Sequence, residues 1–212
     1  MQLISKTSTK KTFAHTWYVY PIVGTLLTLL WIWSFQAFHQ PSTHQKLNMF
    51  FATEIRNEKF INKILEKYSK EDLREITPSY CLPSKGTTYE SKLNLALNVQ
   101  NNTDILVLDD VSLYSFRNVY SSFFLEMSPT IQSKYLTVDD SYYKFDDKDY
   151  GVLLKKKGED HYLKQYMDFE EDRDYYIVIS SASKNIGEVL GEGNAHYDNA
   201  LSVMKYLISE NR

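Results

Sequence analysis

Polar side chains follow three short apolar runs of this chain, at positions where a ligand could be bound. The runs have the character of strands, and the side chains after them are hydroxyls and carboxylates: Thr53, Glu54, Ser84, Asp109 and Asp110. In an open α/β sheet, ligands bind outside the carboxyl ends of the strands. Oxygen atoms there could hydrogen-bond to the hydroxyls of a sugar or to an amine. These five residues are therefore the candidate ligand-binding residues.

The same residues could instead have structural roles. Thr53 could cap a following helix, with Glu54 in its favourable first turn. Asp109 and Asp110 could organise a turn before a helix that begins at Ser112. The sequence leaves ligand binding and these structural roles open.

Motifs for catalysis or cofactor binding are absent from the sequence. No Gly-x-Ser-x-Gly elbow and no His-Glu-x-x-His motif occurs. The tripeptide Ser84-Lys85-Gly86 lacks the upstream glycines of a phosphate-binding loop. His161 and His196 are expected to have surface or capping roles. We therefore expect no enzyme, no catalytic residue and no cofactor, with a hydrolytic enzyme as the least favoured alternative.

Two acidic stretches could suggest a metal site. In the first, which holds Asp139, Asp140, Asp146, Asp147 and Asp149, Gly151 comes too early for a calcium-binding loop. The second runs from residue 170 to 174. We expect both stretches to be solvated loops and expect no metal site. Cys81 is the single cysteine, so it cannot form an intramolecular disulfide and is expected to be a small buried residue.

The elements that would position these side chains follow from hydrophobic periodicity. Apolar runs predict strands at 47–52, 76–82, 104–109, 150–154 and 175–180. Helical spacing predicts four helices, one ending near Tyr68, one opened by the capping box Thr87-x-x-Glu90, one from Ser112 to a stop at Ser128 and Pro129, and one at 197–208. Residues 135–149 are expected to form a loop or hairpin.

Strands and helices alternate at the start, which predicts an α/β domain with a mostly parallel sheet of about five strands. Helices would cover both faces of the sheet and so give three layers. The run at 104–109 has no alternation, as is typical of a strand that is buried on both faces.

An N-terminal transmembrane helix is predicted from Thr16 to Phe38, because these 23 residues carry no charge. Aromatic side chains stand at both ends of the span. Lysines precede it, which places the N-terminus in the cytoplasm and the following domain outside. The alternative is a cleaved signal peptide, but the apolar core is long and ends in large side chains. The expected organisation is a cytoplasmic tail (1–15), the membrane helix (16–38), a linker (39–45) and an extracytoplasmic domain (46–212).

The charge is unevenly distributed along the chain. The first 38 residues hold three of the 24 basic residues and no acidic one, so 21 basic residues face 27 acidic ones in the remainder. An acidic domain repels phosphates, so nucleic acid is not an expected partner.

Several segments resemble lobe one of the extracellular solute-binding proteins of ABC transporters, of the sugar-binding kind. KLNMFFATEI is similar to the opening strand, TDILVLDD to the third strand, and DYGVLL to the segment that leads toward the hinge. YYIVISSASKNIGE and NALSVMKYLI resemble the returning strand and the helix after it. The resemblance covers residues 46–208 and implies a single lobe of the periplasmic-binding-protein fold.

The chain also departs from that family. Its members are about twice as long and are secreted or lipid-anchored. Only 20 residues, between Leu154 and Tyr175, stand where the second lobe is inserted, which is too few for a lobe with its own core.

From the resemblance and the anchor we expect a membrane-tethered binding module, accessory to a transporter or receptor, that recognises a solute such as a sugar. The alternative is an interaction or scaffold protein without a small ligand. A small ligand would require a pocket lined by Thr53, Ser84 and Asp109, whereas a scaffold would show those positions filled and an exposed apolar patch elsewhere.

Overall fold

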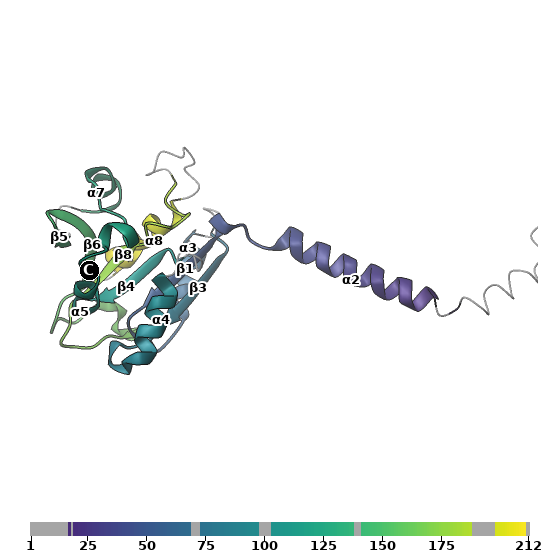
Figure 1. Ribbon diagram of the computed structural model, residues 1–212, viewed down its shortest axis with the longest axis horizontal. Coiled ribbons are helices and arrows are strands. Elements are labelled where there is room, and N and C mark those ends of the chain that lie inside the picture. The colour runs from purple at the N-terminus through teal and green to yellow at the C-terminus, as the bar shows by residue number, and fades with distance from the viewer. Residues whose placement is uncertain are drawn as a thin grey trace, which may run out of the picture. The chain divides into compact units, whose positions relative to one another are not determined.

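The chain forms two compact units, residues 1–40 and residues 41–212. A computed structural model describes residues 17, 19–68, 73–97, 103–137, 141–187 and 198–210, and its elements are shown in Figure 1.

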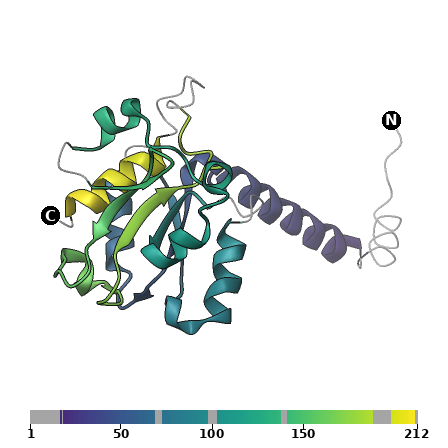
Figure 2. The same ribbon diagram turned by 60° about the vertical axis from the view of Figure 1, so that its left-hand side comes forward.

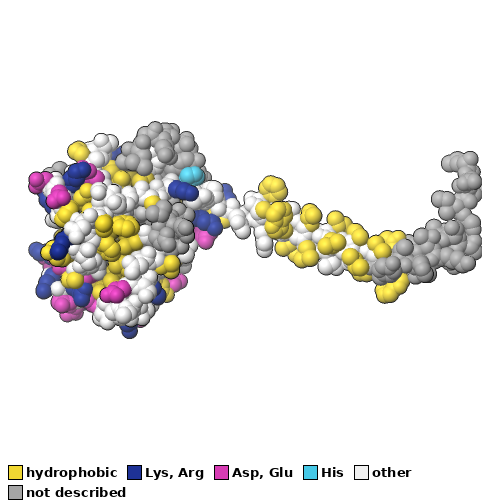
Figure 3. Space-filling model, viewed as in Figure 1, with side chains coloured by type: hydrophobic (Ala, Val, Ile, Leu, Met, Phe, Trp, Pro, Cys, Tyr) yellow, Lys and Arg dark blue, Asp and Glu magenta, His cyan; other side chains and the backbone are white. Residues whose placement is uncertain are grey.

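The first unit contains one long apolar helix, α2 (Val19–His39), of 21 residues. At 1.5 Å per residue it is about 31 Å long, close to the thickness of a hydrocarbon core. None of its side chains is buried, and Figure 3 shows apolar side chains along it. The helix is long and apolar enough to cross a membrane, a property that an N-terminal signal sequence shares. Thr16 and Tyr18, part of the predicted span, lie outside the described residues.

The second unit is built on a mixed sheet of six strands in the order β3-β1-β4-β8-β6-β5. The strands are β1 (Lys46–Phe51), β3 (Glu75–Tyr80), β4 (Ile105–Asp109), β5 (Tyr142–Phe145), β6 (Lys148–Lys155) and β8 (Tyr175–Ile179). β1 pairs in parallel with β3 and with β4, and the other three pairings are antiparallel. A separate two-stranded sheet joins β2 (Glu54–Ile55) to β7 (Met167–Asp168).

The prediction of a mostly parallel sheet of about five strands is therefore correct for the α/β class and needs correction in detail. β8 lies between β4 and β6 and runs antiparallel to both. β6 thus has the direction of β4 without pairing with it. β5, the sixth strand, forms a hairpin with β6 in the region where a loop or hairpin was expected. Strand direction depends on connections across the sheet, which apolar runs do not encode.

Position within the sheet explains the composition of the strands. β4 is buried at every position, as its unbroken apolar run predicts. β3 is an edge strand, and Pro78 is tolerated there because an edge strand needs ladder hydrogen bonds on one side only. Cys81, just after β3, is a buried free cysteine, as predicted.

Helices cover both faces of the sheet. They are α3 (Lys59–Tyr68), α4 (Thr87–Leu97), α5 (Asp110–Ser115), α6 (Tyr120–Phe123), α7 (Pro129–Tyr135) and α8 (Asn199–Glu210). Neighbouring residues of β1 point to opposite faces, since Phe51 packs against Phe60 of α3 and Phe50 against Tyr89 of α4. α8 contacts α3, so α8 and α4 lie on opposite sides of the sheet (Figure 2).

The long helix predicted after Ser112 is wrong, because the chain forms two short helices there. α5 ends at Ser115 and α6 begins at Tyr120. The buried Tyr120 donates its hydroxyl to the carbonyl of Leu113 at 2.6 Å, and its ring stacks on Phe145 of β5. Tertiary burial of this ring therefore overrides the helical periodicity.

The helix α7 was not predicted, whereas the last helix was. Ser128 and Pro129, expected as a stop, instead begin α7, where the Ser128 hydroxyl accepts a hydrogen bond from the Ile131 amide at 3.5 Å. α8 begins at Asn199, and Tyr197 lies outside the described residues.

The chain enters the domain through the short 3-10 helix η1 (Thr43–Gln45), which is fastened to distant segments. Asn199 donates its side-chain amide to the carbonyl of His44 at 2.9 Å, and Asn185 does the same to Lys46 at 3.0 Å. The backbone amide of Arg74 donates to the carbonyl of Gln45 at 2.9 Å. Three hydrogen bonds from distant segments therefore stabilise the start of β1.

Candidate functional site

Residues 156–174, called here the connecting segment, join β6 to β8 and cover the carboxyl ends of the parallel strands. Within this segment Asp168 of β7 pairs with Glu54 of β2. The carbonyl of Asp174 accepts a hydrogen bond from the Asp110 amide at 3.0 Å. The segment therefore contacts the chain both after β1 and after β4.

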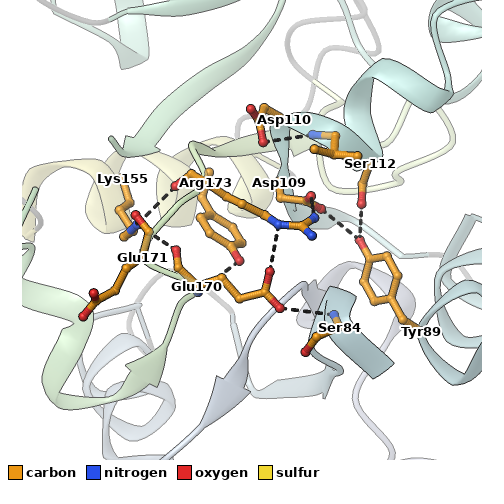
Figure 4. A network of polar contacts seen from close by, with 11 residues as sticks. Ser84, Tyr89, Asp109, Asp110, Ser112, Lys155, Glu170, Glu171 and Arg173 are labelled. Carbon is orange, nitrogen blue, oxygen red and sulfur yellow. Dashed lines mark hydrogen bonds and ion pairs between the residues drawn. The ribbon is translucent and has the colours of Figure 1, made fainter. Parts of the chain in front are cut away.

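A buried ion pair lies at the centre of this edge. Asp109, the last residue of β4, has no exposed side-chain surface, and its Oδ2 contacts the guanidinium of Arg173 (Figure 4). The Nε of Arg173 also lies 2.8 Å from Oε2 of Glu170. Glu170 accepts in turn from the backbone amide of Ser84 at 3.1 Å. One arginine thus links the end of β4 to η3 (Pro83–Lys85), which follows β3.

The second oxygen of Asp109 is bound from α4. The hydroxyl of Tyr89 donates to Oδ1 at 3.4 Å and lies 2.8 Å from the hydroxyl of Ser112. Burial raises the pKa of Tyr89 well above its usual value, so the phenol stays protonated and remains a donor. Both oxygens of Asp109 are therefore bound by side chains of the domain itself.

A buried lysine fixes the far end of the connecting segment. Lys155, at the end of β6, is only 4% exposed. Its ammonium donates to the carbonyls of Glu170 at 2.9 Å, Arg173 at 3.1 Å and Glu171 at 3.5 Å. Burial lowers the pKa of Lys155, and these three acceptors match the three protons of the ammonium. These hydrogen bonds from Lys155 fix the conformation of the backbone around Arg173.

The structure brings three of the five predicted site residues together around one part of the connecting segment. Ser84, Asp109 and Asp110 contact its residues 170–174. Thr53 is fully buried, and its hydroxyl donates to the carbonyl of Glu54 at 3.4 Å. Glu54 pairs through its backbone with Asp168 of the same segment, and its side chain is exposed on β2.

The alternative structural role of Thr53 as a helix cap is wrong. The following helix begins at Lys59, and its amide donates to the side chain of Asn57 at 2.9 Å. Thr53 lies six residues before that helix, and Glu54 belongs to the intervening strand β2.

Asp110 begins α5 and is the more accessible of the two aspartates. Its carboxylate accepts from the Val111 amide at 2.9 Å. Burial raises its pKa, and the neighbouring carboxylates of Asp109 and Asp174 act in the same direction. Beside it, Val111 and Tyr114 are 59% and 60% exposed. Two large apolar side chains are therefore exposed on α5, beside the charged edge.

The described ranges show neither a cluster of metal ligands nor a capping role for His161. No cluster of three or more His, Cys, Asp or Glu side chains in them is arranged to hold a metal ion. His161 precedes the 3-10 helix η5 (Tyr162–Gln165) but makes no capping hydrogen bond with its side chain. Asp139, Asp140 and His196 lie outside the described residues.

Sequence reasoning missed the connecting segment as part of this edge. The stretch at 170–174 was expected to be a solvated acidic loop, but the Glu170 side chain is only 19% exposed and binds Arg173. The available signal was Arg173 itself, a single cation within the acidic run EEDRD. Lys155 and Tyr89 gave no signal, because their roles depend on contacts distant in sequence.

Comparison of the chain with protein-family models, curated proteins and solved structures gave no significant match.

Proposed function

We propose that this chain is a membrane-tethered, extracytoplasmic binding module without enzymatic activity, and that a partner protein docks at the carboxyl-end edge of its parallel strands. The observation that carries the proposal is the closure of this edge by the connecting segment. Asp109 is fully buried and engaged by Arg173 and Tyr89, so it offers no free carboxylate to a solute. Next to it, Val111 and Tyr114 expose large apolar surfaces.

The order of elements supports a relationship to lobe one of the solute-binding proteins. The chain leaves the sheet at β6, passes through the connecting segment, returns as β8 and continues to α8. In that family the second lobe is inserted at this place. Here the connecting segment occupies it and closes onto the strand ends, so the two-lobed enclosure of a solute has no counterpart. An interaction role therefore fits this chain better than capture of a solute at Thr53, Glu54, Ser84, Asp109 and Asp110.

The apolar helix supports the tether. Lys6, Lys10 and Lys11 precede α2, and an excess of lysine marks the cytoplasmic side of a membrane helix. η1 begins at Thr43, so few residues separate it from the end of α2 at His39. A short connection keeps the domain near the membrane, where the partner would be the extracytoplasmic part of a transporter or receptor.

His161 is a weak candidate for a general base. Burial lowers its pKa to about 4, and the nearby charges of Lys155 and Lys164 act in the same direction. A general base works best when its pKa lies near the working pH. His161 is therefore a poor base at neutral pH.

The proposal is tested by the size of the complex that the full-length chain forms in its own membrane. We expect the wild-type chain, extracted in mild detergent, to migrate in a native gel as a complex larger than the free chain. Val111→Asp and Tyr114→Asp place a charge in the docking surface and should release the free chain.

Leu95→Asp is the matched control, because Leu95 is 61% exposed on α4. This variant should keep the complex. If Tyr114→Asp and Leu95→Asp migrate alike, or if the wild type forms no complex, docking at this edge is rejected.

A further inference from the structure

Three side chains form a stripe along α5 and the turn that follows it. Asp110 begins the helix, and Tyr114 and Arg117 follow it at positions i+4 and i+7. Residues at this spacing lie on one side of a helix. The guanidinium of Arg117 does lie over the ring of Tyr114, 4.4 Å from its centre. This α5 stripe therefore has a carboxylate at one end, a guanidinium at the other, and between them a ring that is 60% exposed.

The acidic end of the α5 stripe has an excess of negative charge. Burial raises the pKa of Asp110, and the carboxylates of Asp109 and Asp174 raise it further. The amide of Val111 and the charge of Arg173 act in the opposite direction, but Arg173 is already paired with Asp109. Asp110 itself forms no ion pair with a residue that the structure describes. A cation from another chain would reduce the repulsion among these carboxylates.

The basic end of the α5 stripe has an exposed guanidinium. Among the described residues Arg117 forms no ion pair, and its contact with Tyr114 is a cation–π interaction. Two other charged residues, Asp146 and Lys148, line a cavity beside it. Lys148 is paired with Glu126 at 2.6 Å, and Asp146 is not paired with Arg117 across the cavity. The guanidinium is therefore available to a carboxylate of another chain.

A stripe with opposite charges at its two ends is complementary to a second copy of itself. When two such stripes run antiparallel about a twofold axis, Asp110 of each copy faces Arg117 of the other. The two Tyr114 rings then meet near the axis, and Val111 adds apolar surface beside them. A lipid surface or a peptide with charges of one sign would match only one end of the stripe. We propose that two copies of this chain pair through α5, with two Asp110–Arg117 ion pairs around Tyr114.

Pairing through α5 would regulate the docking surface, and the inference rests on the proposed function because both use Val111 and Tyr114. The second copy covers these side chains, so a transporter or receptor would have to displace it. Chains that are anchored in one membrane meet at a high effective concentration, so a small interface is sufficient for pairing. The pair is thus the resting form of the docking surface.

The test is resonance energy transfer between purified full-length chains that carry a donor or an acceptor dye at the C-terminus. The chains are reconstituted together in phosphatidylcholine vesicles. We expect transfer in the wild type that persists when the lipid is diluted, as random proximity does not. Asp110→Arg alone and Arg117→Asp alone place like charges opposite each other, so each variant should pair with itself at least tenfold more weakly than the wild type.

A mixture of the two variants makes the test specific. Asp110→Arg chains and Arg117→Asp chains have opposite charges at both contacts, so transfer between the two variants should return to the level of the wild type. Lys59→Asp reverses an exposed charge on α3, outside the stripe, and should pair like the wild type. Random transfer in the wild type, or no recovery in the mixture, would overturn the proposal. Melting followed by circular dichroism establishes that the variants are folded.

The purified chain separates this inference from docking to another protein. In the native gel of the membrane extract, a complex with the mass of two chains is the pair, whereas a heavier complex contains another protein. A heavier complex that Tyr114→Asp disrupts, together with random transfer between purified chains, would retain docking and reject pairing. Rescue in the mixture without any heavier complex would retain pairing and reject docking to a transporter or receptor.

Discussion

Arg173 places its guanidinium against the carboxylate of Asp109, 64 positions earlier in the chain. The carboxylate side chain is fully buried, whereas the arginine is 26% exposed. This contact holds the connecting segment against the end of β4.

Removal of Arg173 should therefore destabilise the folded domain. Arg173→Ala leaves the buried Asp109 without its cation, and we expect a loss of about 3 kcal/mol in the free energy of unfolding. Urea unfolding of the full chain in nanodiscs, followed by circular dichroism, measures this loss. The control is Arg56→Ala, which breaks a pair whose side chains are about half exposed and should cost less than ~1 kcal/mol. Equal losses in the two variants would show that burial of Asp109 does not set the cost.

The hairpin between β5 and β6 should be stabilised by glycine. Asp146 and Asp147 at its turn have φ angles of 49° and 60°, a region that glycine enters without the steric cost of a side chain. We expect Asp147→Gly to raise the free energy of unfolding by roughly 0.5 kcal/mol. Asp172→Gly, at an exposed turn position without a positive φ, should lower it by a similar amount. A destabilising Asp147→Gly would contradict the turn geometry.

Acid should weaken the domain through His161. Burial lowers its pKa in the folded state from 6.5 to about 4, so the unfolded chain binds more protons between these values. The contribution of His161 to the free energy of unfolding is fully present above pH 6.5 and is lost as the pH falls toward 4. Melting temperatures measured across this range should fall less steeply for His161→Gln than for the wild type.

A second buried group explains why the comparison must be made between variants. Burial raises the pKa of Asp104, so stability linked to that carboxyl is lost as the pH rises, the opposite direction to His161. The wild-type profile contains both effects, whereas the difference from His161→Gln isolates the histidine. Parallel profiles of the two proteins would refute the role of His161.

The contact between β6 and β8 should not tolerate a larger residue at Gly151. A Cβ atom there would lie 2.9 Å from Cγ1 of Val178, inside the closest contact seen for such atoms. We expect Gly151→Ala to lower the free energy of unfolding by about 1 to 3 kcal/mol. Gly24→Ala, where a Cβ atom would meet nothing within 4 Å, serves as the control and should leave domain unfolding unchanged.

The parts of the fold that the sequence predicts correctly are those in which the local pattern and the final environment agree. The uninterrupted apolar run of β4 is buried on both faces, and the apolar stripe of α3 faces the core. The first two βα units therefore follow from periodicity. The reverse direction of β8 and the break after α5 do not, because both depend on contacts between distant segments, such as Tyr120 with Phe145.

In the candidate site, too, the sequence predicts what depends on local pattern and misses what depends on contacts between distant segments. The carboxyl-end rule correctly brings Ser84, Asp109 and Asp110 to one edge. What the rule cannot supply is the partner of each group, because Arg173 and Glu170 reach the edge only through the path of the connecting segment. A strand-end carboxylate is available to a ligand only when no other part of the chain neutralises it.

The place where the chain enters the domain has a mechanical consequence. β1 begins directly after η1 and is hydrogen-bonded on both sides, to β3 and to β4. A pulling force applied through the N-terminal connection would load these two ladders along the strand direction, so that many bonds resist together instead of breaking one by one. The hydrogen bonds from Asn199, Asn185 and Arg74 would bear the load first. Tension at the N-terminal end of β1 would therefore be opposed by both ladders and by these three hydrogen bonds.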